Sequence, residues 1–131
     1  MYDNLLKADA DSAAAANNLA MLLVTYHSDK PSLDRARSLT ERFASSRNPT
    51  FIDTWGWVLY KRGEYTDAVT ALQKAVDKAP QVPEIFYHLA MAQLKTGARD
   101  SARTNLDQAL KSDAAFPGSE EAKKTLDELK R

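Results

Sequence analysis

Apolar residues in the middle of the chain recur at intervals of three and four, the spacing that places side chains on one face of an α-helix. This pattern predicts one helix from about Thr50 to Arg62 and another from about Thr66 to Lys78. The residues expected on the packed faces are Ile52, Trp55, Gly56 and Leu59 in the first helix, and Ala68, Leu72, Ala75 and Val76 in the second. Gly63 can adopt the left-handed conformation that ends a helix, and Pro80 and Pro83 stop the second helix. The unit is predicted to be a helix hairpin.

The hairpin repeats along the chain with a period of roughly 34 residues. A shift by this period brings Pro49 onto Pro83, and Pro83 onto Pro117. It also superposes Lys61 on Lys95, Gly63 on Gly97, Ala68 on Ala102, Thr70 on Thr104, Leu72 on Leu106 and Ala75 on Ala109. Identities at so many helix-ending and packing positions indicate several copies of one structural unit.

Small residues are expected where the two helices of each hairpin cross. Gly56 is predicted to face Ala68, and the equivalent pairs are Ala20 with Ala36 and Ala90 with Ala102. Small side chains at a crossing let helix axes approach toward the near end of the range of about 8–10 Å. A larger residue at such a position should wedge the hairpin open.

The stretch from Trp55 to Ala68, followed by Leu72, Ala75 and Pro80, resembles the tetratricopeptide repeat family. The resemblance implies an all-α fold, a right-handed α-solenoid of antiparallel helix hairpins with a capping helix at its C-terminal end. Residues 83–116 keep the pattern but have Ala114 in place of the closing proline. The first repeat departs from it by a longer turn, expected over His27–Leu33, and by Phe43 where alanine is usual.

This resemblance divides the chain into five parts. They are the second-helix remnant of a preceding repeat over 1–12, repeats over 13–48, 49–82 and 83–116, and a capping helix over 117–131. Tyr2, Leu5 and Leu6 mark the remnant, which favours an artificial start at Met1. Ser119 is predicted to cap the last helix, with Glu120 and Glu121 in the first turn where the helix dipole favours anions.

The repeats are also similar to the last repeats of long bacterial tetratricopeptide proteins, among them exported lipoproteins associated with exosortase and exopolysaccharide systems. This similarity implies that the chain is one end of a larger bacterial protein. It favours a periplasmic or membrane-associated location through a part of the protein that precedes Met1, although the sequence itself leaves the compartment undecided.

Composition narrows the function classes. Eighteen Lys and Arg balance eighteen Asp and Glu, so the chain lacks the positive excess that attracts nucleic acid. The absence of cysteine excludes disulfides and thiolate metal sites. The longest apolar run, Leu19–Val24, is far shorter than the roughly 20 residues of a membrane-spanning helix, so no direct membrane insertion is expected.

No arrangement of side chains points to catalysis, a cofactor or a metal. His27 and His88 each lack a second histidine three or four residues away, as a helical pair of histidine ligands requires, and are interpreted as isolated residues. The carboxylates, including Asp53 and Glu84, are expected on exposed faces or in first turns, without the burial that tunes a catalytic acid. Arg35, Arg37, Arg42 and Arg47 alternate with Asp34 and Glu41, which indicates a solvated face. The chain is therefore not predicted to be an enzyme.

The resemblance also implies a concave surface lined by the first helix of each repeat. The residues that it places there are Asn17, Met21, Thr25, Asp53, Trp57, Tyr60, Lys61, Tyr87, His88, Met91 and Lys95. A groove rich in aromatic residues and methionine suits a helix or an extended segment with large apolar anchors. The cationic clamp of chaperone-adaptor repeats is absent, because the matching positions carry Asn17, Met21, Thr54, Glu84 and His88.

Two functions stay open. The first is a scaffold that binds a partner peptide or helix in the groove. The second is a structural end module of a longer array, with possible self-association through Tyr2, Leu5 and Leu6. Under the second reading, Trp57 and Tyr60 only complete the packing between repeats.

Overall fold

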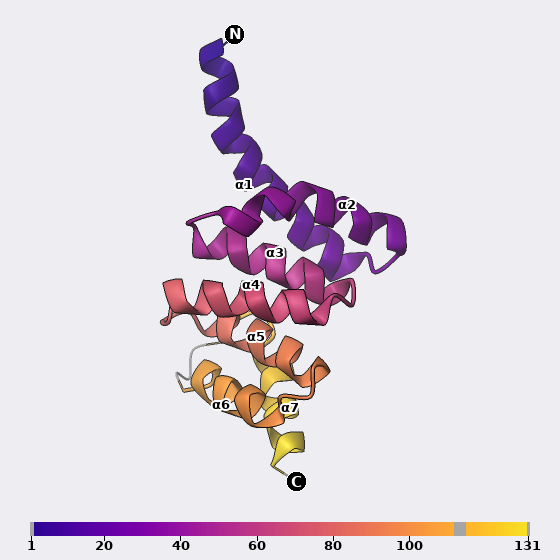
Figure 1. Cartoon of the computed structure of the whole chain (residues 1–131), viewed down its shortest axis with the longest axis vertical. Helices are drawn as coiled ribbons and strands as arrows, with labels where there is room; N and C mark the ends of the chain where they lie inside the picture. The colour runs from indigo at the N-terminus through magenta and orange to yellow at the C-terminus, as the bar shows by residue number, and fades with distance from the viewer. Residues whose placement is uncertain (1, 112–114, 131) are drawn as a thin grey trace.

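The computed structural model describes the backbone of residues 2–111 and 115–130, and the side chains of residues 12–111 and 115–130. Within these ranges every regular element is helical, as the sequence predicts. The elements are α1 (Tyr2–Tyr26), α2 (Lys30–Thr40), the 3₁₀ helix η1 (Glu41–Ser45), α3 (Pro49–Lys61), α4 (Tyr65–Lys78), α5 (Pro83–Lys95), α6 (Arg99–Ala109) and α7 (Ser119–Leu129). They form an elongated stack, with the N-terminal half of α1 projecting beyond it (Figure 1).

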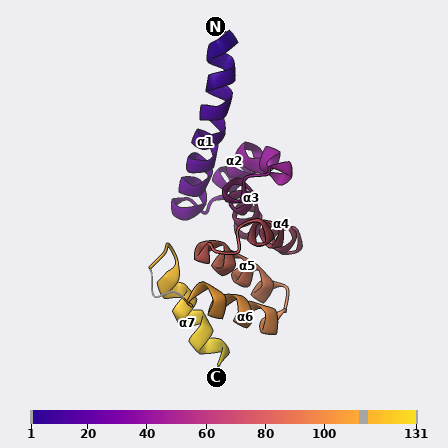
Figure 2. The same ribbon diagram turned by 90° about the vertical axis from the view of Figure 1, so that its left-hand side faces the viewer.

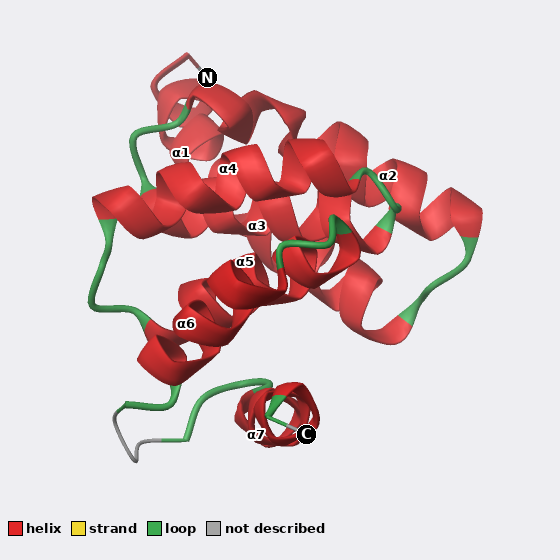
Figure 3. Ribbon diagram, turned by 60° about the horizontal axis from the view of Figure 1, so that its bottom comes forward, coloured by secondary structure: helices red, strands yellow, loops and turns green. Residues whose placement is uncertain are grey.

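The helices pair into hairpins that stack in chain order. Each helix contacts the next one, and α1 also contacts α3, α3 contacts α5, and α5 contacts α7. Figure 2 shows α1 to the left of α2, and α7 to the left of α6. In Figure 3, α7 is seen end-on beside α5 and α6. Helix α7 therefore takes the position that the first helix of a further repeat would occupy.

Glycine closes the second and third hairpins. Gly63 and Gly97 have φ angles of 87° and 88°, as expected for residues that end a helix in the left-handed conformation. The amide of Glu64 donates to the carbonyl of Leu59 at 2.9 Å, and the amide of Ala98 donates to that of Gln93 at 2.9 Å. These bonds satisfy carbonyl groups that the ends of α3 and α5 would otherwise leave free.

The first hairpin closes without glycine. The carboxylate of Asp29 caps α2 by accepting from the amide of Ser32 at 3.1 Å, and a proline lies in the first turn of α2. The longer turn expected over His27–Leu33 is wrong, because only residues 27–29 separate α1 from α2. Because Asp29 and the proline start α2 early, the extra residues of the first repeat lie in the helix ends on either side of the turn instead.

The crossing of α3 and α4 leaves no room for a side chain at Gly56, but its contacts differ from those predicted. A Cβ atom on Gly56 would lie 2.6 Å from Cγ of Leu72 and 3.3 Å from Cβ of Ala71. Ala68, the expected partner, is not among the nearest neighbours, because Gly56 faces the second turn of α4 rather than the first. Ala68 and Leu72 are both fully buried, so this contact lies in the core.

Two expectations for the chain ends differ from the structure. Residues 1–12 were predicted as a separate helix, but α1 continues from Tyr2 to Tyr26. No Gly or Pro interrupts this segment, and the alanines of 13–16 favour a continuous helix. The side chains of Tyr2, Leu5 and Leu6 lie outside the described residues. Helix α7 is preceded by Gly118 with φ 94°, so Ser119 is its first residue and not its cap.

Charged residues join the first repeat to the second. Arg62 pairs with Asp34 of α2 and, at 2.8 Å, with Glu64. Arg37 lies 3.4 Å from Glu64 and 3.4 Å from Glu41. The hydrogen bonds of Asp34 to Lys30 and Arg62 lower the pKa of its carboxyl. Arg37 is therefore engaged with acidic side chains, in agreement with the interpretation of this region as a solvated face.

Candidate functional site

A small hollow lies where the first helices of the repeats meet. Its volume is about 200 Å³. Residues from three helices and one loop line it: Met21 and Thr25 of α1, Trp57 and Lys61 of α3, Glu84, Tyr87 and His88 of α5, and Pro117 and Gly118 before α7. We call this the groove pocket. It brings together residues that are up to 97 positions apart in the sequence, from Met21 to Gly118.

Aromatic rings form one wall of the groove pocket. Trp57 stacks on Tyr60, with ring centroids 4.5 Å apart and planes at 8°. Its other stacked contact is His88, at 4.0 Å and 20°. Tyr87 packs obliquely against Trp57 at 5.8 Å. Trp57 and Tyr87 each keep only 7% of their surface exposed, so their rings are packed into the wall and do not project into solvent.

His88 of this wall belongs to a buried acid–histidine pair. Nδ1 of His88 is 2.7 Å from Oδ1 of Asp53, and both side chains are buried. The expectation that Asp53 lies on an exposed face is therefore wrong, as is the interpretation of His88 as an isolated residue. Asp53 and His88 are 35 residues apart, which is one more than the repeat period, so stacking of adjacent repeats brings them together.

Glu84 was also expected to be exposed, but it is partly buried in the groove pocket. Burial raises the pKa of its carboxyl, the nearby His88 acts to lower it, and Asp53 acts to raise it. Its neighbour Tyr87 has a pKa raised to about 12, chiefly by burial and then by the negative charge of Glu121. The pocket thus combines an aromatic wall with a carboxylate that is partly removed from water.

Lys61 supplies a positive charge at the same site. Its ammonium group lies 5.0 Å from the ring centroid of Trp57 and 5.9 Å from that of Tyr60, within the range of a cation–π contact. Lys61 itself is exposed. The stacked position of Tyr60 leaves its phenol partly buried, and burial raises the pKa of Tyr60. Charge and aromatic surface are therefore adjacent on α3.

The segment before α7 closes one end of the groove pocket. The ring of Phe116 lies 6.1 Å from that of Tyr87. A Cβ atom on Gly118 would lie 2.4 Å from Cε2 of Tyr87, and the φ of Gly118 is 94°. Only glycine meets both conditions without strain. The sequence marks this residue only as a helix breaker, so its contact with Tyr87 was missed.

Six of the eleven residues predicted to line the concave surface do line the groove pocket: Met21, Thr25, Trp57, Lys61, Tyr87 and His88. Asp53 and Tyr60 support it from behind through His88 and Trp57. Asn17 is partly buried, and its Oδ1 has no hydrogen-bond partner in the described part of the chain. Met91 packs against the core, and Lys95 lies 5.9 Å from the ring of Tyr65. Binding by any of the eleven stays a prediction.

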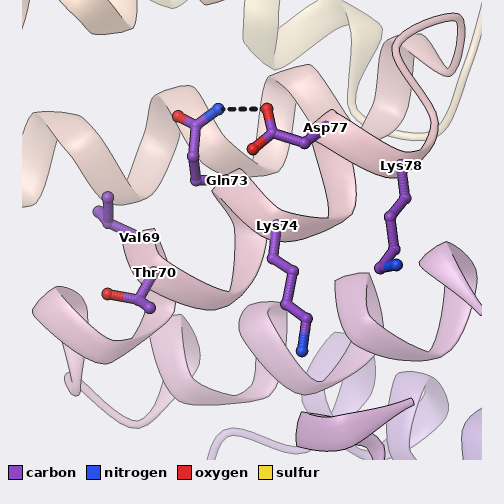
Figure 4. Close-up of a pocket in the computed structure, with 6 residues that line it drawn as sticks. All are labelled: Val69, Thr70, Gln73, Lys74, Asp77 and Lys78. Carbon is purple, nitrogen blue, oxygen red and sulfur yellow. Dashed lines mark hydrogen bonds between the residues drawn. The ribbon is translucent and has the colours of Figure 1, made fainter. Parts of the chain in front are cut away.

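A larger hollow lies on α4. Its volume is about 680 Å³, and its lining residues are Val69, Thr70, Gln73, Lys74, Asp77 and Lys78 (Figure 4). All six come from one helix, Gln73 donates to Asp77 at 3.0 Å, and Lys74 donates to the carbonyl of Ala44 at 3.1 Å. We call it the α4 hollow. The polar groups of the α4 hollow already form some hydrogen bonds with one another and with the backbone. The groove pocket is therefore the better candidate for a binding site, although its volume is smaller.

Other kinds of site find no support in the described residues. No group of three or more His, Cys, Asp or Glu there could hold a metal ion. In the same part of the chain, no helix is both long and apolar enough to cross a membrane.

Family comparisons agree with the repeat. Residues 56–97 match the family model described as TPR repeat, and residues 84–114 match the one described as Tetratricopeptide repeat. Residues 56–114 are tetratricopeptide repeats. These repeats include α4, α5 and α6 and therefore one side of the groove pocket. A comparison with curated proteins finds no match.

Solved structures share the tetratricopeptide fold. The type III secretion translocator chaperone SycD of Yersinia enterocolitica superposes with a TM-score of 0.74 at 17% identity, covering 92% of this chain and 85% of that one. A SycD structure in complex with a peptide of the translocator YopD gives 0.72 at 17% identity, covering 92% and 93%. A type III secretion complex from Aeromonas hydrophila gives 0.72 at 19%, covering 92% and 81%. Since the identities are this low, the likeness is one of fold.

Proposed function

We propose that this chain is a non-catalytic interaction module whose groove pocket binds an extended or helical segment of a partner protein. The observation that carries the proposal is the lining of the pocket. Three consecutive first helices contribute side chains to one hollow, next to a wall of stacked rings. A surface of this kind suits the aromatic and apolar anchors of a peptide. That one SycD structure contains a peptide of a translocator supports a peptide ligand for this chain as well.

The test uses two threonines, one in each hollow. Thr25 lines the groove pocket, Thr70 lines the α4 hollow, and both are exposed on helices. The probe is a phage-displayed library of random peptides, selected on the whole chain. We expect Thr25→Trp to abolish binding of the selected peptides, because the indole fills the groove pocket, whereas Thr70→Trp should leave binding unchanged.

Two results would count against this function. Loss of binding in Thr70→Trp with retention in Thr25→Trp would move the site to α4. A library that yields no selective peptide would favour the structural alternative. Trp57→Ala is a weaker test than Thr25→Trp, because the ring is buried and its removal also disturbs the packing of Tyr60 and His88.

A second candidate function is that of an end module that self-associates or extends a longer array, within a larger bacterial protein. It is favoured by the projecting half of α1 (Figure 1) and by Leu22 and Tyr26, which are 54% and 74% exposed. Light scattering of the whole chain tests self-association. A dimer that Leu22→Glu dissociates would support it, and a monomer at every concentration would contradict it.

A further inference from the structure

The groove pocket contains a carboxylate, that of Glu84, for which the described residues provide no hydrogen bond or ion pair. His88, whose charge acts on Glu84, is itself paired with Asp53 at 2.7 Å. Lys61, the cation of the pocket, lies over Trp57 and makes no ion pair within the same described residues. A partly buried carboxylate without a partner is costly unless something supplies one.

The position of Glu84 in the first turn of α5 does not explain why a carboxylate lies partly buried in the groove pocket. An anion in the first turn of α5 interacts favourably with the helix dipole. However, Asp67, Asp100 and Glu120 lie in the first turns of α4, α6 and α7 and are exposed to water. The equivalent of Glu84 in the preceding repeat is Thr50, which is neutral and exposed. Dipole interaction therefore does not require a carboxylate that faces Trp57 and Tyr87.

We propose that Glu84 makes the groove pocket selective for a peptide that carries a lysine or arginine next to a large apolar side chain. This inference rests on the proposed function. The apolar side chain contacts Met21, Trp57 and Tyr87, while the cation donates to the carboxylate of Glu84. A charge-assisted hydrogen bond at a partly buried carboxylate is stronger than one in open water. Lys61, at the α3 side of the pocket, disfavours peptides with a second cation close to the first.

The experiment uses a peptide array in which a central phenylalanine or leucine is followed by lysine, glutamine or glutamate, in otherwise identical sequences. Binding to the whole chain is measured for each set, and the NMR signal of the Trp57 indole reports occupation of the pocket. We expect lysine peptides to bind the unmodified chain about tenfold more tightly than their glutamate counterparts at low salt. The preference should weaken as salt is added.

Variants of Glu84 test whether its negative charge causes the preference for lysine peptides. Glu84→Gln keeps the shape of the side chain and should remove the preference, whereas Glu84→Lys should reverse it toward glutamate peptides. Asp107→Lys makes the same change of charge at an exposed position of α6 outside the pocket lining and should keep the original preference. Circular dichroism establishes that each variant is folded.

The outcomes separate this inference from the proposed function. If Thr25→Trp blocks binding but Glu84→Lys leaves the charge preference unchanged, the pocket binds peptides and the role of Glu84 is wrong. The same holds if lysine and glutamate peptides bind the unmodified chain equally. If no peptide in the array shifts the Trp57 indole signal, both the inference and the peptide-binding function are overturned.

Discussion

The first and second repeats build the same hairpin around different side chains. In the second repeat Ala75 is fully buried, and α4 continues as a regular helix to Lys78. The first repeat has Phe43 at this place, where α2 has already ended at Thr40 and the chain tightens into η1. The ring of Phe43 is buried by stacking on Phe51 of α3, with centroids 4.6 Å apart and planes at 15°.

This difference shows how a repeat tolerates a large residue at a position that is usually small. A helix that runs straight through the contact needs a small side chain there, because the axes are close. When the side chain is large, the helix end changes its winding and the ring packs to one side. The same repeat also has extra residues in the helix ends next to its turn, since 16 positions separate Ala20 from Ala36 and only 12 separate Gly56 from Ala68.

Removal of the Phe43 ring should reduce the free energy of unfolding more than the other changes described below. Phe43→Ala deletes the ring that stacks on Phe51 and leaves a cavity between η1 and α3, so we expect a loss of about 3–5 kcal/mol in the free energy of unfolding. Urea unfolding followed by circular dichroism measures it. A loss near zero would mean that η1 closes the space as a regular helix with alanine, as α4 does around Ala75.

Gly56→Ala tests the close crossing in the second repeat. The new methyl group would overlap Leu72, which is fully buried and cannot swing away. Overpacking costs about 1–3 kcal/mol, and the better helix propensity of alanine offsets about 1 kcal/mol. We expect net destabilisation in urea unfolding, partly rescued by Leu72→Val. The matched change in the first repeat, Ala20→Gly, should cost about 1 kcal/mol in helix propensity and also the packing of one methyl group, because Ala20 is fully buried. Stabilisation by Gly56→Ala would contradict the crossing.

Gly63→Ala tests the turn of the second hairpin. Its φ of 87° is unfavourable for alanine by about 1–2 kcal/mol, even though the space around it is open. The control is Ser28→Ala in the first turn, where no residue has positive φ, and we expect a change within about 0.5 kcal/mol. Thermal unfolding of both variants compares the turns. Equal effects would mean that the backbone conformation at Gly63 does not matter for stability.

A fall in pH should reduce the free energy of unfolding only slightly through the ion pairs of Asp34 between the first and second repeats. The folded-state pKa of Asp34 lies below its ordinary value of 3.8, so its ionised form stabilises the fold at higher pH. This contribution is fully present above the ordinary pKa and is lost as the pH falls through the folded value. Asp34→Asn should remove this part of the pH dependence, as measured by unfolding at a series of acidic pH values. The effect should be the smallest of the four, since the carboxyl is exposed and screened by solvent.

Much of the fold could be predicted because glycine and proline residues mark the ends of the helices at the repeat period. Gly63 and Gly97 do take positive φ, and the prolines at 49 and 83 lie in the first turns of α3 and α5. The candidate site was predicted less well. Asp53 and Glu84 were assigned to exposed faces, because the spacing along one helix says nothing of the neighbouring repeat that covers it. The extent of α1 was also missed, since no local signal distinguishes two helices from one where no breaker separates them.

By itself the sequence determined the type of unit, its period and the residues that end each helix, because these depend on local conformational preferences. Its resemblance to the tetratricopeptide repeats also placed Met21, Thr25, Trp57, Lys61, Tyr87 and His88 on the face where the groove pocket lies. Only the tertiary structure decided that Asp53 binds His88, that Gly118 packs on Tyr87 and that Glu84 is left without a partner in the described residues. The physical reason is that burial and pairing depend on how successive repeats stack, and stacking joins residues a full period or more apart.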